Sequence, residues 1–153
     1  MSINKAFKII EDNSDDADFV GEIDKAIIEA AEQKLEVKFP YSYYQFLKRY
    51  GLGDIFSEEI YGLGTEETGF PNIVWITQLF RKEYKLPKQF IPIHNSGYDN
   101  EYYCLDCSNI KSREDDHAPV LLMYADSSSE NQSLEVTDQT FGDFLLNLLE
   151  DSM

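Results

Sequence analysis

The chain has 153 residues, of which 42% are hydrophobic and 14% aromatic, so it is long and apolar enough to bury one ordinary core. Its 29 acidic and 13 basic residues give a net charge of -16, which argues against nucleic-acid binding and against docking on anionic lipid. The same charge would steer a positively charged protein partner toward the surface, or would serve solubility alone.

The N-terminal residues and the cysteine content indicate a cytoplasmic protein. Residues 1–16 contain no long apolar run and soon become acidic, unlike a secretory signal peptide. No stretch approaches the ~18 apolar residues that a membrane span needs. Two cysteines do not make a disulfide framework, so we expect both thiols to be reduced.

Two helices are predicted before residue 36. Ile3, Phe7 and Ile10 follow the i, i+4, i+7 spacing of one helix face. Residues 22–35 predict a second helix with two acids in its first turn. Its apolar side is expected to comprise Ile23, Ile27, Ala30, Ala31 and Leu35. The acidic residues between 11 and 18 are expected to form a solvated loop.

The segment FPYSYYQFLKRYG, residues 39–51, predicts a helix rich in aromatic rings. Pro40 suits the first turn of a helix, where its missing N–H needs no partner. Gly51 suits the left-handed position that ends a helix. An i, i+3, i+4, i+7 stripe is formed by Tyr43, Phe46, Leu47 and Tyr50. A stripe of this spacing is more typical of a buried core than of a ligand site.

Beyond residue 53 the sequence predicts short strands separated by turn residues. Runs at 59–64 and 72–76 are β-like, and residues 77–85 predict a short helix capped by Thr77. Residues 90–93 and 101–105 are separated by seven residues that are rich in turn formers, which favours an antiparallel hairpin.

The last part of the chain predicts one more strand and a closing helix. Residues 120–124 are the most apolar strand candidate, whereas residues 109–118 predict a charged, mobile loop. The closing helix has Thr137 or Thr140 as its N-cap. Its apolar stripe contains Phe141, Phe144, Leu145 and Leu148, with Leu146 and Leu149 beside it. This order predicts a single α+β domain over residues 1–153, with helices around a mainly antiparallel sheet of short strands.

The two cysteines and two histidines offer the strongest candidates for chemistry. Cys104 and Cys107 form a C-x-x-C, and His94 and His117 lie on either side of it. They could form a redox pair, a Cys₂His₂ zinc site, or two structural thiols beside two loop histidines. The spacing matches no common zinc module, and no nucleophile or nucleotide-binding arrangement is present. We therefore expect no catalytic residue, metal ligand or cofactor, and no enzymatic activity.

Acidic side chains cluster at three places and are the candidate partner-binding residues. They are Glu58, Glu59, Glu66 and Glu67 around the glycine-rich strand, Asp99 and Glu101 at the hairpin, and Glu114, Asp115 and Asp116 in the late loop. Each cluster could equally be an ordinary solvated face.

Residues 28–51 closely resemble the first motif of the SUKH superfamily. The matching positions are Ile28, Ala31, Glu32, Leu35, Phe39, Pro40, Tyr43, Phe46, Leu47 and Gly51. Later segments resemble further motifs of the family in the same order. They are residues 60–63, which include Tyr61 and Gly62, and residues 91–93, 96–98 and 102–106. In the closing helix the matching residues are Phe141, Phe144 and Leu145. The resemblance covers about residues 20–150 and implies the same α+β fold.

The resemblance also implies a function. Many bacterial members are immunity proteins that bind and neutralise a polymorphic toxin, often a nuclease, whereas fungal members regulate cell-wall assembly and resistance to killer toxin. We expect an immunity protein whose partner is a basic toxin domain; the alternative is an interaction or regulatory module with an endogenous partner. Direct nucleic-acid and membrane binding are not expected, and a homodimer is left open. The contact residues lie on the family's variable surface and do not carry over.

Overall fold

The computed structural model describes residues 1–64, 68–126 and 134–153. Within these residues it contains five α-helices, one short 3-10 helix and seven strands. In chain order they are α1 (Ser2–Asp12), the 3-10 helix (Ser14–Asp16), β1 (Ala17–Phe19), α2 (Lys25–Leu35), α3 (Tyr41–Tyr50), β2 (Gly53–Ile55), β3 (Glu58–Ile60), α4 (Ile73–Tyr84), β4 (Phe90–Asn95), β5 (Glu101–Asp106), β6 (Val120–Tyr124), β7 (Glu135–Asp138) and α5 (Phe141–Ser152).

The strands form two antiparallel sheets. The smaller sheet has the order β1-β2-β3 and the larger one has the order β4-β5-β6-β7. The chain leaving β3 joins them, because the N–H of Tyr61 donates to the carbonyl oxygen of Ile93 in β4 at 2.8 Å. The predicted hairpin of residues 90–105 is confirmed by the pairing of β4 with β5.

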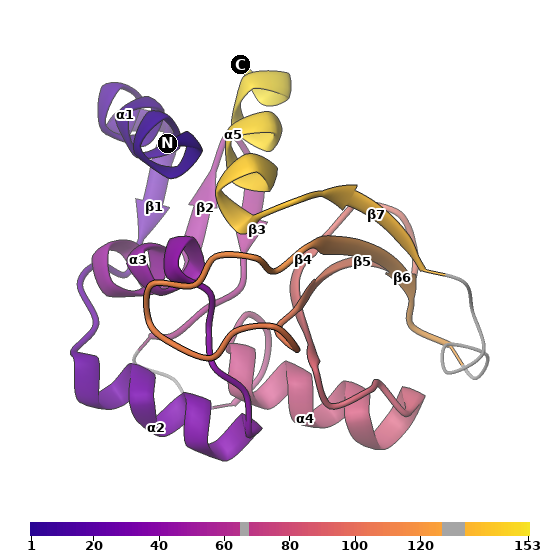
Figure 1. The fold of residues 1–153 in the computed structure, drawn as a ribbon. Helices are drawn as coiled ribbons and strands as arrows, with labels where there is room; N and C mark the ends of the chain where they lie inside the picture. Colours follow the sequence, from indigo (N-terminus) through magenta and orange to yellow (C-terminus); the bar gives the residue numbers. More distant parts are fainter. Residues whose placement is uncertain (65–67, 127–133) are drawn as a thin grey trace.

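Helices cover both faces of the larger sheet (Figure 1). Adjacent residues of a strand point to opposite faces, and β5 shows this with two tyrosines. The ring of Tyr102 meets Phe80 of α4 at 4.8 Å between centroids, and the ring of Tyr103 meets Phe144 of α5 at 5.0 Å. Helix α1 lies beside α5 (Figure 1). The α+β architecture predicted from the sequence is therefore confirmed.

The rings of α3 fill the core between the two sheets and α5, as their spacing predicts. Tyr43, Phe46 and Leu47 have no exposed surface. The ring of Tyr43 meets Phe141 of α5 at 5.0 Å between centroids. Its hydroxyl donates to the backbone oxygen of Tyr61 at 2.8 Å, so the polar end of this buried ring is satisfied.

Gly51 and Gly62 lie back to back where α3 ends. Gly51 has a φ of +74°, a conformation that favours glycine, and its carbonyl oxygen accepts from the N–H of Leu63 at 3.0 Å. A side chain at Gly62 would collide with that same carbonyl. Two glycines are therefore needed for the chain after β3 to pass the end of α3.

The strand predicted at residues 72–76 is wrong, because these residues begin α4. The Asn72 side chain caps this helix and accepts from the N–H groups of Val74 and Trp75 at 2.9 and 3.0 Å. Thr77, the predicted cap, is buried inside the helix. The β-branched run from residue 73 suggested a strand, but the buried positions have helical spacing. They are Ile73, Ile76, Thr77 and Phe80.

Other differences concern short strands and one helix face. β1, β2 and β7 were not predicted, and β1 lies partly within the expected acidic loop. Helix α2 begins at Lys25, so Glu22 and Asp24, the acids expected in its first turn, precede the helix. Ile27 is 49% exposed, whereas Ile28 is buried. Thr140 caps α5 through the N–H of Asp143.

Candidate functional site

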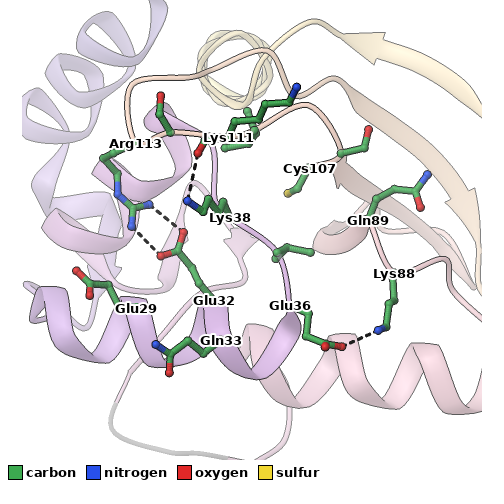
Figure 2. A pocket seen from close by; sticks show the side chains of 14 residues that line it. Glu29, Glu32, Gln33, Glu36, Lys38, Lys88, Gln89, Cys107, Lys111 and Arg113 are labelled. Atoms are coloured by element: carbon green, nitrogen blue, oxygen red, sulfur yellow. Dashed lines mark hydrogen bonds and ion pairs between the residues drawn. The ribbon is translucent and has the colours of Figure 1, made fainter.

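A groove of about 1000 Å³ runs along α2 (Figure 2). Its first wall is α2, which contributes Glu29, Glu32, Gln33 and Glu36. Its second wall is the first half of the β5–β6 loop, here residues 107–119. That wall contributes Cys107, Ser108, Ile110, Lys111, Ser112 and Arg113. Residues 37–38 and 88–89 complete the lining.

Glu32 holds the two walls together. Arg113 donates to its two carboxylate oxygens at 2.7 and 2.9 Å, and the N–H of Phe39 donates to Oε2 at 2.8 Å. The Arg113 guanidinium also lies 3.9 Å from the centre of the Tyr44 ring. Glu32 is 8% exposed, whereas the Arg113 side chain is 31% exposed, so water is excluded only from the carboxylate side of this bidentate pair. Glu32 therefore connects α2, the start of α3 and the β5–β6 loop.

One further ion pair and one bond from a lysine to the backbone lie in the groove. Lys88 lies 2.7 Å from a carboxylate oxygen of Glu36, and Lys38 donates to the backbone oxygen of Lys111 at 3.1 Å (Figure 2). The opposite charges of Lys88 and Glu36 are so close that their electric fields largely cancel farther away. The lining contains three acidic and four basic residues, so its formal charges nearly balance and the groove offers a partner little net field.

The cysteines and histidines do not assemble into a site. Both thiols are free and buried, and burial raises the pKa of Cys104 and of Cys107, so neither is poised as a reactive thiolate. His94 is buried, but His117 is exposed. Among the described residues, no three potential ligands come together as a metal centre. The structure thus favours structural thiols over a redox pair or a zinc site.

His94 connects β4 to β3. Its Nδ1 lies 2.6 Å from the backbone oxygen of Glu59, and its Nε2 lies 3.1 Å from Oε2 of Glu58. Its ring lies beside Tyr103 and Phe144. Burial lowers the pKa of His94, although the contacts with Glu59 and Glu58 oppose that shift.

The candidate partner-binding acids lie in separate places. Glu58 and Glu59 lie on β3, Asp99 lies in the exposed turn between β4 and β5, and Glu101 begins β5. Glu66 and Glu67 lie outside the described residues. Glu114, Asp115 and Asp116 lie in the β5–β6 loop. Nine of the positions matched to the family motifs form its structural signature, and all nine are buried: Glu32, Leu35, Pro40, Tyr43, Phe46, Leu47, Gly51, Tyr61 and Gly62.

Asp115 and Asp116 bind their own chain. Asp115 accepts from the N–H groups of Lys111 and Ser112, and these bonds hold the pKa of Asp115 below its usual value. Asp116 accepts from the N–H and the hydroxyl of Ser42, both at 2.8 Å. Ser42 lies in the first turn of α3, so Asp116 caps that helix from 74 residues away. The loop of residues 109–118, which was expected to be mobile, is thus held in place by hydrogen bonds.

A second surface combines acidic and aromatic side chains on the larger sheet. We call it the acidic sheet face and define it as Glu101, Tyr103, Tyr124, Glu135 and Asp138. In the register Glu101 lies opposite Tyr124, while Tyr103 and Glu135 both lie opposite Leu122. Residues directly opposite each other share a face, so four of the five project together.

The acids of this face change the pKa of its two tyrosines. Burial raises the pKa of Tyr103, and the charges of Glu101, Asp138 and Glu58 raise it further. The charge of Glu101 is the main cause of the raised pKa of Tyr124. Glu101 and Glu58 were among the acids predicted from the sequence, whereas those of β7 were not, since that strand was not predicted.

Comparison with known families agrees with these features. A sequence model of the family described as SMI1-KNR4 cell-wall, SUKH_5, matches residues 3–150. That family covers immunity proteins and SMI1/KNR4-like regulators and is generally non-enzymatic. In the part of the chain that the structure describes, none of the helices has the length and apolar content needed to cross a bilayer. The match spans nearly all of the sequence, and the chain therefore belongs to the SUKH superfamily.

Proposed function

We propose that this protein is a cytoplasmic immunity protein that neutralises a cognate polymorphic toxin by stoichiometric binding. The observation that carries the proposal is the net charge of -16 in a member of this family. A nuclease is the favoured target, because nuclease domains hold phosphates in basic grooves. An acidic protein that covers such a groove would exclude the substrate and would associate quickly with it.

In this proposal the buried family positions maintain the fold, and exposed positions recognise the toxin. Glu32, Tyr43, Gly51 and Gly62 maintain the scaffold through the contacts described above. Exposed side chains are then free to differ between immunity proteins without loss of the fold. Recognition of one particular toxin would therefore depend on the surface acids and not on the family motif.

The proposal is tested by affinity capture of the tagged protein from its native cells, followed by mass spectrometry. We expect a secreted protein whose C-terminal domain is toxic when expressed alone and harmless when this chain is co-expressed. Purified toxin domain should lose activity at one equivalent of this chain. A captured housekeeping or wall-synthesis protein, with no toxicity to relieve, would instead support the regulatory function found elsewhere in the family.

A further inference from the structure

Positive charge is concentrated in one layer of this acidic molecule. Helices α2 and α4 lie side by side (Figure 1). We call residues 25–38 and 73–89, which contain these helices, the α2–α4 layer. It holds seven of the 13 basic residues but only four of the 29 acidic ones. This layer therefore has a net positive charge, whereas the rest of the chain is strongly negative.

The groove along α2 borders this layer, and the carboxylates of its lining are already engaged. Glu32 is bound by Arg113, and Glu36 by Lys88. Glu29, the remaining acid of the lining, lies 3.6 Å from the lysine one helical turn earlier. Each carboxylate of the groove thus has a cation of this chain beside it.

Two lysines of the lining have no such partner. Among the described residues, no carboxylate lies within ion-pair distance of Lys38 or Lys111. Both side chains belong to exposed residues, and the Lys38 ammonium donates to the backbone oxygen of Lys111, so the two residues are neighbours (Figure 2). Asp115 accepts from the backbone N–H of Lys111, and the Lys111 charge contributes least to its lowered pKa.

Arg81 of α4 adds a third cation behind the groove. One nitrogen of its guanidinium donates to the backbone oxygens of Leu35 and Lys88, both at 2.8 Å. Its Nε is buried and has no hydrogen-bond partner among the described residues. Burial lowers the pKa of Arg81, because its surroundings stabilise the charge less than water does. The groove offers little field at a distance, but at short range its surplus charge is positive.

The rest of the lining suits a polypeptide. Gln33 and Gln89 are exposed, and each amide can donate and accept, as a peptide backbone requires. Val37 and Ile110 supply apolar surface. Alternate side chains of an extended segment point to opposite sides, so its carboxylates and its apolar side chains can face different parts of one groove.

We propose that the groove along α2 binds an extended acidic segment of a partner protein. Carboxylates of that segment lie against Lys38 and Lys111, and its apolar side chains contact Val37 and Ile110. This inference goes beyond the proposed function and does not rest on it, because the surface acids, and not the groove, would meet a basic toxin.

The proposal is tested with a hexapeptide of alternating glutamate and valine, blocked at both ends, titrated into ¹⁵N-labelled protein. The salt concentration is ~0.15 M, where exposed charges farther away than ~8 Å are largely screened. We expect the largest amide shifts within residues 36–38, 88–89 and 107–113. The double variant Lys38→Gln/Lys111→Gln should bind the peptide at least about fivefold more weakly. Its matched control, Lys5→Gln/Lys48→Gln, removes the same charge at exposed lysines outside the groove and should weaken binding less than about twofold.

Two further probes identify what the groove recognises. A peptide with glutamine in place of each glutamate should bind at least about fivefold more weakly than the acidic one. Citrate carries carboxylates without a peptide, so equal shifts at an equal concentration of citrate would overturn the acidic segment as the occupant.

Amide shifts outside the groove, equal weakening in the two double variants, equal binding of the glutamine peptide, or no binding would each overturn the proposal. The amide spectrum of each variant shows whether it is folded. A wild-type protein that fails to neutralise the captured toxin would refute the proposed function and would leave the groove proposal unaffected.

Discussion

The two ring nitrogens of His94 both face oxygen atoms, although the ring is buried. The contacts with Glu59 and Glu58 favour the protonated ring, whereas burial favours the neutral one. Burial has the larger effect, so the pKa of His94 lies below its ordinary value. The folded protein therefore binds this proton more weakly than the unfolded chain does.

We expect the stability due to neutral His94 to be fully present above pH ~6.5, the ordinary value for histidine, and to be lost as the pH falls below it. The loss is at most ~1.4 kcal/mol per pH unit. Urea unfolding of the wild type and of His94→Gln at pH ~7.5 and ~5.5 measures the effect. The advantage of the wild type should shrink at the lower pH.

The exposed histidine provides the control for that experiment. His117→Gln should follow the wild type at both pH values, because His117 lies at the surface. If the wild type instead gained stability over His94→Gln as the pH fell, the ion pair with Glu58 would outweigh burial.

At the scale of elements, the β5–β6 loop is a structural part of the fold. Asp116 accepts two hydrogen bonds from Ser42, and the Ser42 oxygen accepts from the N–H of Gly142 at 3.1 Å. One buried serine thus joins the loop to the first turns of both α3 and α5. Burial raises the pKa of Asp116, and the bonds from Ser42 oppose this change.

We expect Asp116→Ala to lower the free energy of unfolding by about 2 kcal/mol, because it leaves two buried donors of Ser42 without an acceptor. Asp116→Asn keeps an acceptor oxygen and should lose less. Glu114→Ala, an exposed residue of the same loop, should change stability by less than about 0.5 kcal/mol. Chemical denaturation of the three variants gives these values, and equal losses for residues 114 and 116 would contradict the capping role.

The long amphipathic elements could be predicted from the sequence, whereas the short ones could not. Helices α3 and α5 have ten and twelve residues, and each contains an i, i+3, i+4, i+7 apolar stripe that fixes both the type of element and its buried face. Strands β1 and β2 have three residues each, too few for an alternating pattern to show. Their existence depends on pairing with each other, which is a tertiary property.

The candidate site was predictable only in part for the same reason. The family motif around Glu32 is contiguous in the sequence, so it could be identified before its partner Arg113 was known. The acidic sheet face is assembled from β5, β6 and β7 by their register. Without β7, neither Glu135 nor Asp138 could be placed beside Glu101.

At the scale of the whole molecule, the charge has consequences for association beyond any single contact. A charge of -16 attracts a basic domain before the two surfaces touch. Residues 89–153 contain 13 acidic but only two basic residues, so that attraction would also orient the larger sheet toward a basic partner. Exposed charges act over the Debye length, which falls from ~30 Å at 0.01 M salt to ~3 Å at 1 M.

We therefore expect the association rate constant with the captured toxin domain to fall at least about tenfold between ~20 mM and ~500 mM sodium chloride. The dissociation rate should change much less, because contacts at short range are screened weakly. Stopped-flow mixing at several salt concentrations separates the two rates. An association rate that is independent of salt would show that the charge serves solubility and not recognition. The control Glu22→Lys/Glu83→Lys makes the same change in net charge as Glu101→Lys/Glu135→Lys, but at exposed acids outside the larger sheet. A weaker salt dependence in Glu101→Lys/Glu135→Lys than in this control would place the steering charge on the acidic sheet face.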